Sequence, residues 1–248
     1  MNNPYTYLIR TTLLSIIFLA APSTRCIKTS SALRQTIKRA LNPHSLFIQH
    51  VRPHQLHKAA AAGDLKTIRR LLELHTPPDA TDIYGKTPLM MAAYMAHLSA
   101  VKLLIEHGAN VNASSIYKTT PLIQAVNNNS TEISSLLIDS GANVNTATAA
   151  GETVLMRAAA MGNANTVYFL LAHGANPHEI DSYGENALAK AVHSSSIDIT
   201  KALLKNGVSM TLQNNWGVSP LQIAYDQKNK KMVNLLFSHL NQSREPKK

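Results

Sequence analysis

The stretch Gly85-Lys86-Thr87-Pro88-Leu89-Met90-Met91-Ala92-Ala93 decides the fold, because its leucine and its first alanine recur along the chain. The leucine returns every 33 residues, without insertion or deletion, at positions 56, 89, 122, 155, 188 and 221. An alanine stands three residues after each of these leucines. A fixed period of this length is typical of solenoids, in which each repeat is one supersecondary unit stacked on the next. The sequence therefore predicts about six structural repeats.

Two apolar patterns in each unit predict a pair of helices. The alanine that follows the repeated leucine is small enough for two helices to approach closely. Farther along stands a cluster such as Val101, Leu104 and Ile105, and apolar residues three and four apart mark one face of a second helix. Neither helix could bury its apolar face alone, so the units are expected to stack.

Glycines separate the helices at a fixed register. One follows the second helix at positions 108, 141, 174 and 207, where a helix end can enter the left-handed region that suits glycine. His75 takes this place in the first unit, where Pro77 and Pro78 are expected to end the helix instead. Another glycine precedes the helix pair at positions 85, 151, 184 and 217, with Lys118 as the exception. Each unit therefore reads turn, helix, loop, helix.

These residues resemble the ankyrin repeat family, whose unit is a β-turn plus two helices with a Thr-Pro-Leu-His-x-Ala signature. The stretch from Gly85 to Ala93 and the tripeptide Thr120-Pro121-Leu122 match that signature closely. The resemblance covers residues 53 to about 240 and implies an all-α ankyrin-repeat solenoid of about six β-turn/helix-loop-helix units. The units are expected near residues 53–83, 84–116, 117–149, 150–182, 183–215 and 216–240.

The fifth unit departs from the family pattern, because it opens with Asn186-Ala187 in place of Thr-Pro. The histidine of the signature survives only as His57. Hydrogen bonds that the family's Thr and His make across turns are therefore expected to be weaker in the fifth unit. This predicts local fraying around residues 186–215.

The residue before each turn glycine forms the most informative surface pattern. Tyr84, Tyr117, Ala150, Tyr183 and Trp216 stand there at 33-residue spacing, and in a regular stack they form a row along the concave side. Tyrosine and tryptophan are enriched at binding hot spots. The family resemblance implies that partner contacts extend to other residues of the turns and first helices, namely Lys86, Thr119, Glu152, Glu185, Tyr94, Met95, Asn127, Asn128, Met161, His193 and Asp226. Alternatively, neighbouring turn aromatics only pack on one another.

Sequence motifs give no support for catalysis. Gly85-Lys86-Thr87 looks like the end of a phosphate-binding loop, but the first glycine of that motif would have to be residue 80, which is Ala80. Neither G-x-S-x-G nor H-E-x-x-H occurs in the sequence. Cys26 is the single cysteine, so no intrachain disulfide or cysteine-rich zinc site can form. We therefore expect no enzyme activity, no catalytic residue and no cofactor.

Three histidines invite a metal-binding interpretation that we reject. His50, His54 and His57 have helical spacing, which would suit a metal site. However, Pro53 is expected to interrupt that helix, and His57 already belongs to the repeat signature. A structural role is the expected one, and no metal is predicted.

The formal charge of +10 is distributed unevenly along the chain. Residues 1–63 contain eight Lys or Arg and no acid, whereas the remainder has 16 basic and 14 acidic residues, a net charge of +2. The repeats are therefore nearly neutral. We expect no nucleic-acid partner for them.

Residues 1–23 have the pattern of a secretory signal peptide. The charge of Arg10 precedes the short apolar run 11–21, and the small residues Ala21 and Ser23 could form a cleavage site. The run is shorter than the roughly 20 residues that span a bilayer. Two alternatives remain open, an uncleaved membrane anchor and an organelle transit peptide rich in Ser, Thr and Arg. Export is the leading expectation for the location of the protein.

Residues 24–52 are expected to be a basic linker containing a short amphipathic helix near residues 30–41, stopped by Asn42-Pro43. This segment could touch an anionic lipid surface, giving membrane contact through residues 1–41. It could equally cap the apolar end of the stack or remain a solvated linker. Residues 241–248 are expected to be a flexible tail.

The sequence thus predicts a non-catalytic protein–protein interaction module that is exported. Its partner would be an unidentified protein bound on the concave surface of turns and first helices, and the chain is expected to be a monomer. The alternative is a membrane-tethered scaffold, or a host-directed effector, that acts through its N-terminal segment. The latter rests on similarity in plan to secreted ankyrin proteins of bacteria that live inside other cells.

Overall fold

The computed structural model describes residues 51–244, all of which belong to one compact unit of the chain. This range contains twelve helices and no β-strand, so the all-α fold class is confirmed. The first helices of the units are α4 (Arg52–Ala62), α6 (Pro88–Tyr94), α8 (Pro121–Asn127), α10 (Val154–Ala160), α12 (Ala187–His193) and α14 (Pro220–Asp226). The second helices are α5 (Leu65–Glu73), α7 (Leu98–Glu106), α9 (Thr131–Asp139), α11 (Ala164–Ala172), α13 (Ile197–Lys205) and α15 (Lys230–Arg244).

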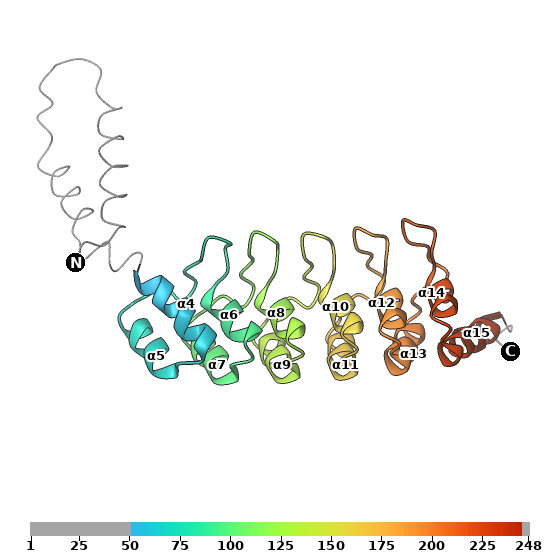
Figure 1. The fold of residues 1–248 in the computed structure, drawn as a ribbon. Helices are drawn as coiled ribbons and strands as arrows, with labels where there is room; N and C mark the ends of the chain where they lie inside the picture. The colour runs from blue at the N-terminus through green and yellow to red at the C-terminus, as the bar shows by residue number, and fades with distance from the viewer. Residues whose placement is uncertain (1–50, 245–248) are drawn as a thin grey trace, which may run out of the picture. The chain divides into compact units, whose positions relative to one another are not determined.

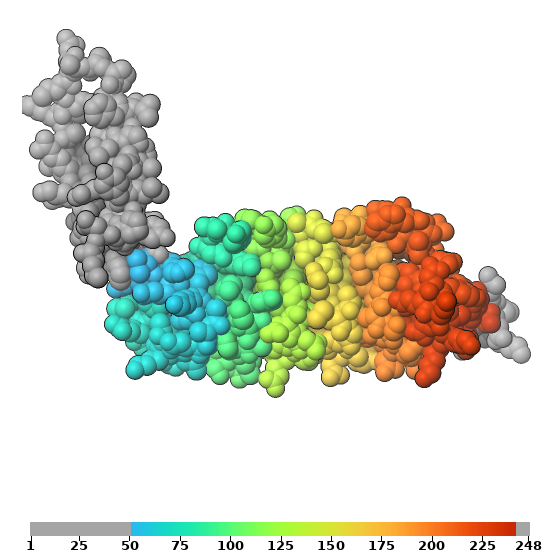
Figure 2. All heavy atoms as spheres, in the orientation of Figure 1, coloured from blue at the N-terminus to red at the C-terminus, as the bar shows by residue number. Residues whose placement is uncertain are grey.

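The twelve helices form two layers (Figure 1). The first helices pack on one another from α4 to α14, and the second helices form the other layer from α5 to α15. Each helix makes its main contacts with the other helix of its unit and with the equivalent helices of adjacent units. The space-filling view shows consecutive units packed side by side in sequence order (Figure 2). The predicted solenoid of stacked units is confirmed.

The loops that connect one unit to the next stand out from the first-helix layer as a row of projections, which we call fingers (Figure 1). Fingers are defined here as residues 77–87, 110–120, 143–153, 176–186 and 209–219. The first helices of adjacent units approach each other more closely than the second helices do. Fingers and first helices together therefore line one face of the stack, which we call the inner surface.

Each of the five short first helices begins with a side-chain cap. The side-chain oxygens of Thr87, Thr120, Thr153, Asn186 and Ser219 accept a hydrogen bond from the backbone N–H three residues later, at 2.9 to 3.4 Å. Asn186 makes the shortest of these bonds, to Ala189, and its Nδ2 also donates to the carbonyl of Ser209 at 3.1 Å. The expectation of weaker hydrogen bonds at this cap is wrong, because asparagine caps a helix as well as threonine does. Fraying of residues 186–215 stays a prediction.

Left-handed backbone marks the end of each second helix except the last, as predicted from the glycines. His75 corrects one detail, since it adopts a positive φ of 57° itself and α5 ends at Glu73, before the two prolines. Lys118 likewise takes a φ of 55° at the turn that lacks glycine. A further left-handed position recurs between the two helices of every unit, at residues 63, 96, 129, 162, 195 and 228, and only two of the six are glycine. An L-residue held there costs about 1–2 kcal/mol, which the packing of the stack must offset.

The start of α4 corrects a second expectation. Pro53 does not interrupt the helix but lies in its first turn, where the missing N–H would have no helical partner in any case. The two ring nitrogens of His57 lie 2.8 Å from the carbonyl oxygens of Pro53 and Lys86. His57 therefore links the first unit to the finger of the second, which is the structural role expected for it.

The repeated leucines form the centre of the core. Leu56, Leu89, Leu122 and Leu188 are fully buried and Leu155 nearly so. Leu221 is only half-buried, because no following unit covers it in the described chain. The identical register of the repeats is therefore confirmed, with an end effect at the last one.

Helix α15 continues through Arg244, so its last four residues lie in the segment that the sequence analysis assigned to a flexible tail. None of the helices in residues 51–244 is long and apolar enough to cross a membrane. The expected signal peptide or anchor at 1–23, the amphipathic helix near 30–41 and most of the 24–52 linker lie outside the described residues.

Candidate functional site

A ladder of backbone hydrogen bonds joins the fingertips. The N–H of Ile116 donates to the carbonyl of Tyr84 at 3.0 Å, and the next three fingers repeat the same bond at 2.9 to 3.0 Å. Within a finger, the tip closes as a turn, for example through the N–H of Gly85 and the carbonyl of Asp82 at 3.0 Å. The fingers are thus fixed relative to one another by bonds that do not depend on the tip side chains.

A polar side chain two residues before the tip aromatic braces the turn from within. Asp82 Oδ1 accepts from the backbone N–H groups of Tyr84 and Lys86, each at 2.8 Å. Ser115, Asp181 and Asn214 make the equivalent pair of bonds in their fingers. These residues were not predicted, although their 33-residue spacing and their type, which favours turns, are visible in the sequence.

The four predicted tip aromatics are exposed on this rigid support. Their exposed fractions are 46% for Tyr84, 55% for Tyr117, 51% for Tyr183 and 66% for Trp216. The rings of Tyr183 and Trp216 stack with centroids 5.8 Å apart, so the alternative of mutual packing applies to this pair. Even so, each of the four residues is roughly half exposed or more and can be covered by a partner.

Two isoleucines extend the apolar fingertips and were not predicted. Ile83 and Ile116 precede Tyr84 and Tyr117, and their side chains are 86% and 61% exposed. The equivalent residues of the later fingers are Ala149, Ser182 and Asn215, which are smaller or polar. A large aliphatic residue directly before the tip aromatic therefore occurs only in the second and third units, although Ile180 and Leu212 are also exposed, at 53% and 38%, in the last two fingers.

The first helices add exposed side chains beside the fingers. Tyr94, Met95 and Met161 are 44% to 47% exposed, and His193 and Asp226 are exposed as well. Asn127 is half-buried. Asn128 is exposed, but its Nδ2 donates to the carbonyl of Tyr94 at 2.6 Å, so it also ties adjacent units together. Every predicted first-helix residue thus lies at the surface, although not all are free of internal bonds.

The predicted turn residues Glu152 and Glu185 are held in ion pairs. Arg157 contacts Glu152 at 2.6 Å. Lys190 contacts Glu185 at 2.6 Å and Asp181 at 2.8 Å. Thr119, at the same register position in the third unit, contacts Ser115 through a hydrogen bond of 2.6 Å between their hydroxyls.

Charges in the fifth unit shift two pKa values. Burial alone would raise the pKa of Glu185, but hydrogen bonds from Lys190 and Asn214, with the charge of Lys190, lower it overall. Burial alone would lower the pKa of Lys190, but hydrogen bonds to Asp181 and Glu185 raise it overall. Glu185 and Lys190 are therefore both charged at neutral pH. They form an ion pair within the inner surface rather than a reactive group.

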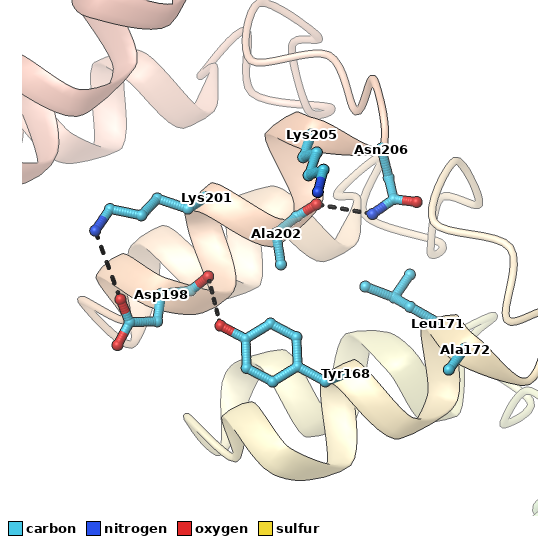
Figure 3. A pocket seen from close by; sticks show the side chains of 8 residues that line it. All are labelled: Tyr168, Leu171, Ala172, Asp198, Lys201, Ala202, Lys205 and Asn206. Atoms are coloured by element: carbon cyan, nitrogen blue, oxygen red, sulfur yellow. Dashed lines mark hydrogen bonds and ion pairs between the residues drawn. The ribbon is translucent and has the colours of Figure 1, made fainter.

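A shallow groove lies on the opposite layer, between α11 and α13 (Figure 3). Its volume is about 600 Å³, and Tyr168, Asp198, Lys201 and Asn206 are among the residues that line it. Their polar atoms bond within the groove, because the Tyr168 hydroxyl donates to the Asp198 carbonyl and Lys201 contacts the Asp198 carboxylate (Figure 3). Across residues 51–244, no three His, Cys, Asp or Glu side chains come together as a metal site.

The two helical layers, the fingers and their bonded tips define a helical repeat protein of the solenoid class. The family description "Ankyrin repeats (3 copies)" matches the sequence in overlapping segments at residues 33–115, 56–148, 114–181 and 155–245. The chain belongs to the ankyrin repeat family. Proteins of this family are generally non-catalytic modules for protein–protein interaction.

The chain is also similar to a solved structure of the same family, an ankyrin repeat domain from Acinetobacter baumannii AYE. The two sequences are 32% identical, the match covers 74% of this chain and 96% of the other, and the TM-score is 0.68. A search of curated proteins finds no match.

Proposed function

We propose that this protein is a non-catalytic module that holds a partner protein against its inner surface. The observation that carries the proposal is the row of exposed aromatic fingertips, fixed from unit to unit by the backbone ladder. Large aromatic side chains are the commonest binding hot spots because they bury much apolar area at a modest cost in side-chain entropy. The bonded fingers add pre-organisation, since a surface that is already ordered loses little entropy on docking.

Truncation of two fingertips tests this proposal. The double variant Tyr117→Ala with Tyr183→Ala removes one ring from each half of the row but leaves the ladder, which uses only backbone atoms. We expect capture of the partner to weaken by about 30-fold or more, as for the loss of one hot spot or several lesser contacts. The measurement is affinity capture with the full chain as bait, with the captured proteins identified and quantified by mass spectrometry.

Tyr168→Ala is the matched control, because Tyr168 is 46% exposed but lies on the second-helix layer. It should leave capture unchanged. Far-UV circular dichroism should show the same helical content for all variants, since none of these rings belongs to the core. Capture that survives the double truncation would place the binding site elsewhere on the protein.

We also propose that the protein is exported through its N-terminal segment. The sequence of Arg10, the apolar run 11–21 and the small residues Ala21 and Ser23 supports this. Cell fractionation with and without residues 1–41, combined with the intact mass of the recovered protein, tests it. Recovery of the full-length chain in the membrane fraction would favour the alternative, a membrane-tethered scaffold.

A further inference from the structure

We propose that the half of the inner surface formed by the first three units binds a segment of the partner that combines apolar side chains with carboxylates, one of which pairs with Lys86. This inference rests on the proposed function and specifies the chemistry of the partner. Three observations lead to it: an incomplete ion-pair position, an uneven distribution of charge and a coincident cluster of exposed apolar residues.

The same two positions recur in every unit that has a finger. One is the residue after the left-handed turn residue, and the other lies five places later on the first helix. The fourth unit fills them with Glu152 and Arg157, and the fifth with Glu185 and Lys190, at 2.6 Å in each case. The third unit has the neutral pair Thr119 and Gln124, and the sixth the apolar pair Val218 and Ile223. In four units, therefore, the two residues match each other in charge or polarity.

The second unit breaks this rule. It places Lys86 at the position of the two glutamates and Met91 at the position of their cations. Within residues 51–244, no carboxylate lies in ion-pair distance of the Lys86 ammonium. Asp82, the nearest acid in sequence, accepts two backbone N–H groups through Oδ1, but it makes no ion pair within residues 51–244, whereas Asp181 makes the same two bonds and also pairs with Lys190. Lys86 is half-buried as a residue, and a carboxylate from a partner would complete the position that the fourth and fifth units fill internally.

The charge of the inner surface is divided between its two halves. From α4 to α8, the fingers and first helices carry Arg52, Lys58, Lys86 and Lys118 against Asp79 and Asp82, a net charge of +2. From residue 143 to the end of α14, they carry two basic and five acidic residues, a net charge of −3. A segment whose acidic part lies over the first three units is therefore favoured over the reverse orientation.

The apolar contacts needed by such a segment lie in the same half. Ile83 and Ile116 are the most exposed fingertip residues of the second and third units, and each is followed by a half-exposed tyrosine, Tyr84 or Tyr117. Tyr94, at the end of α6, adds a further exposed ring in this half. A nucleic acid or another uniform polyanion fits less well, because it would have to avoid the acidic half. An acidic, apolar peptide satisfies both the cations and the exposed rings.

Peptide selection tests the inference. Random peptides displayed on phage are selected on the full chain, and enriched peptides are synthesised with a fluorophore for measurement of their dissociation constants. We expect enriched sequences to carry a net negative charge together with aromatic or branched aliphatic residues. The triple variant Lys58→Glu, Lys86→Glu and Lys118→Glu should bind them about ten-fold more weakly or worse.

The matched control is the triple variant Lys102→Glu, Lys205→Glu and Lys231→Glu, which makes the same change in net charge on exposed second-helix positions. The control variant also keeps the basic N-terminal segment. It therefore distinguishes binding at the inner surface from non-specific attraction between acidic peptides and a basic chain. We expect its affinity for the peptides to stay close to that of the wild type.

The outcomes separate this inference from the proposed function. Peptides that are neutral or basic, yet are weakened by the Tyr117→Ala and Tyr183→Ala variant, would overturn the inference and leave the proposed function standing. Acidic peptides that bind both triple variants alike would also overturn it, as would a selection that enriches nothing. Duplex DNA that displaces the peptides and itself depends on the three lysines would replace the inference with a nucleic-acid site. Acidic peptides indifferent to the fingertip truncation would count against both.

Discussion

Truncation of the repeated leucine at two places should cost very different amounts of stability, although the side chain and its register are the same. Leu122 is fully buried between the second and fourth units, so Leu122→Ala removes three carbons from a closed environment. Such a change costs about 2–5 kcal/mol, because the transfer free energy is lost and the cavity collapses only in part. Leu221 is half-buried in the last unit, where less area is lost and the open side can relax. We expect about 1–2 kcal/mol for Leu221→Ala.

Urea unfolding followed by far-UV circular dichroism measures both losses, taken from the midpoint and the slope of each transition. Leu155→Ala serves as a control, since it occupies the same closed environment one unit along and should match Leu122→Ala. Equal losses for Leu122→Ala and Leu221→Ala would refute the reasoning, because burial between units would then contribute nothing beyond burial within one.

Two further predictions concern backbone and charge. Lys228→Gly should stabilise the protein by about 0.5–1 kcal/mol, because glycine removes the strain of a left-handed L-residue at φ 55° and this outweighs its added chain entropy. Lys231→Gly, inside α15, should destabilise the protein by a similar amount because no such strain is removed there. Thermal unfolding of both variants measures the sign of each change. Lys190→Met should lower the unfolding temperature at neutral pH, and the difference from wild type should shrink as pH falls below about 4.5. The reason is that the pKa of Glu185 lies below its usual 4.5, so the pair stabilises the fold above that pH and is lost as the carboxylate takes up a proton. A difference that persists in acid would contradict this role for Glu185.

The fold could be predicted from the sequence because the same pattern, a leucine followed three residues later by an alanine, occurs six times at a fixed spacing. Each unit buries its leucine and alanine against its neighbours, so the 33-residue spacing of these residues reports directly on the stacking. Helix boundaries followed from Thr-Pro and Gly, since capping and left-handed backbone are local properties. The placement of Tyr84, Tyr117, Tyr183 and Trp216 at exposed fingertips was predictable for the same reason.

Other features could not be read from local pattern. His75 and Lys118 hold left-handed backbone against their own preference, because the surrounding stack fixes the loop whatever residue occupies it. The half-burial of Lys86 and its missing counterion depend on a register between finger and helix, which only the assembled unit shows. Asn128 looked like a free contact residue, yet it bonds across to Tyr94, since neighbouring units meet at that point.

The backbone ladder between fingertips fixes the distances between the exposed aromatic rings as well as supporting them. Each rung connects only adjacent units, so the separation of Tyr117 and Tyr183 is set by the single unit between them, whose own tip is the small pair Ala149 and Ala150. A partner that contacts both Tyr117 and Tyr183 must therefore extend across the small fingertip of the fourth unit. Duplicating or removing a 33-residue unit at this point would change the distance between the Tyr117 and Tyr183 rings. It would therefore change which partners can contact both rings, although the rings themselves stay the same.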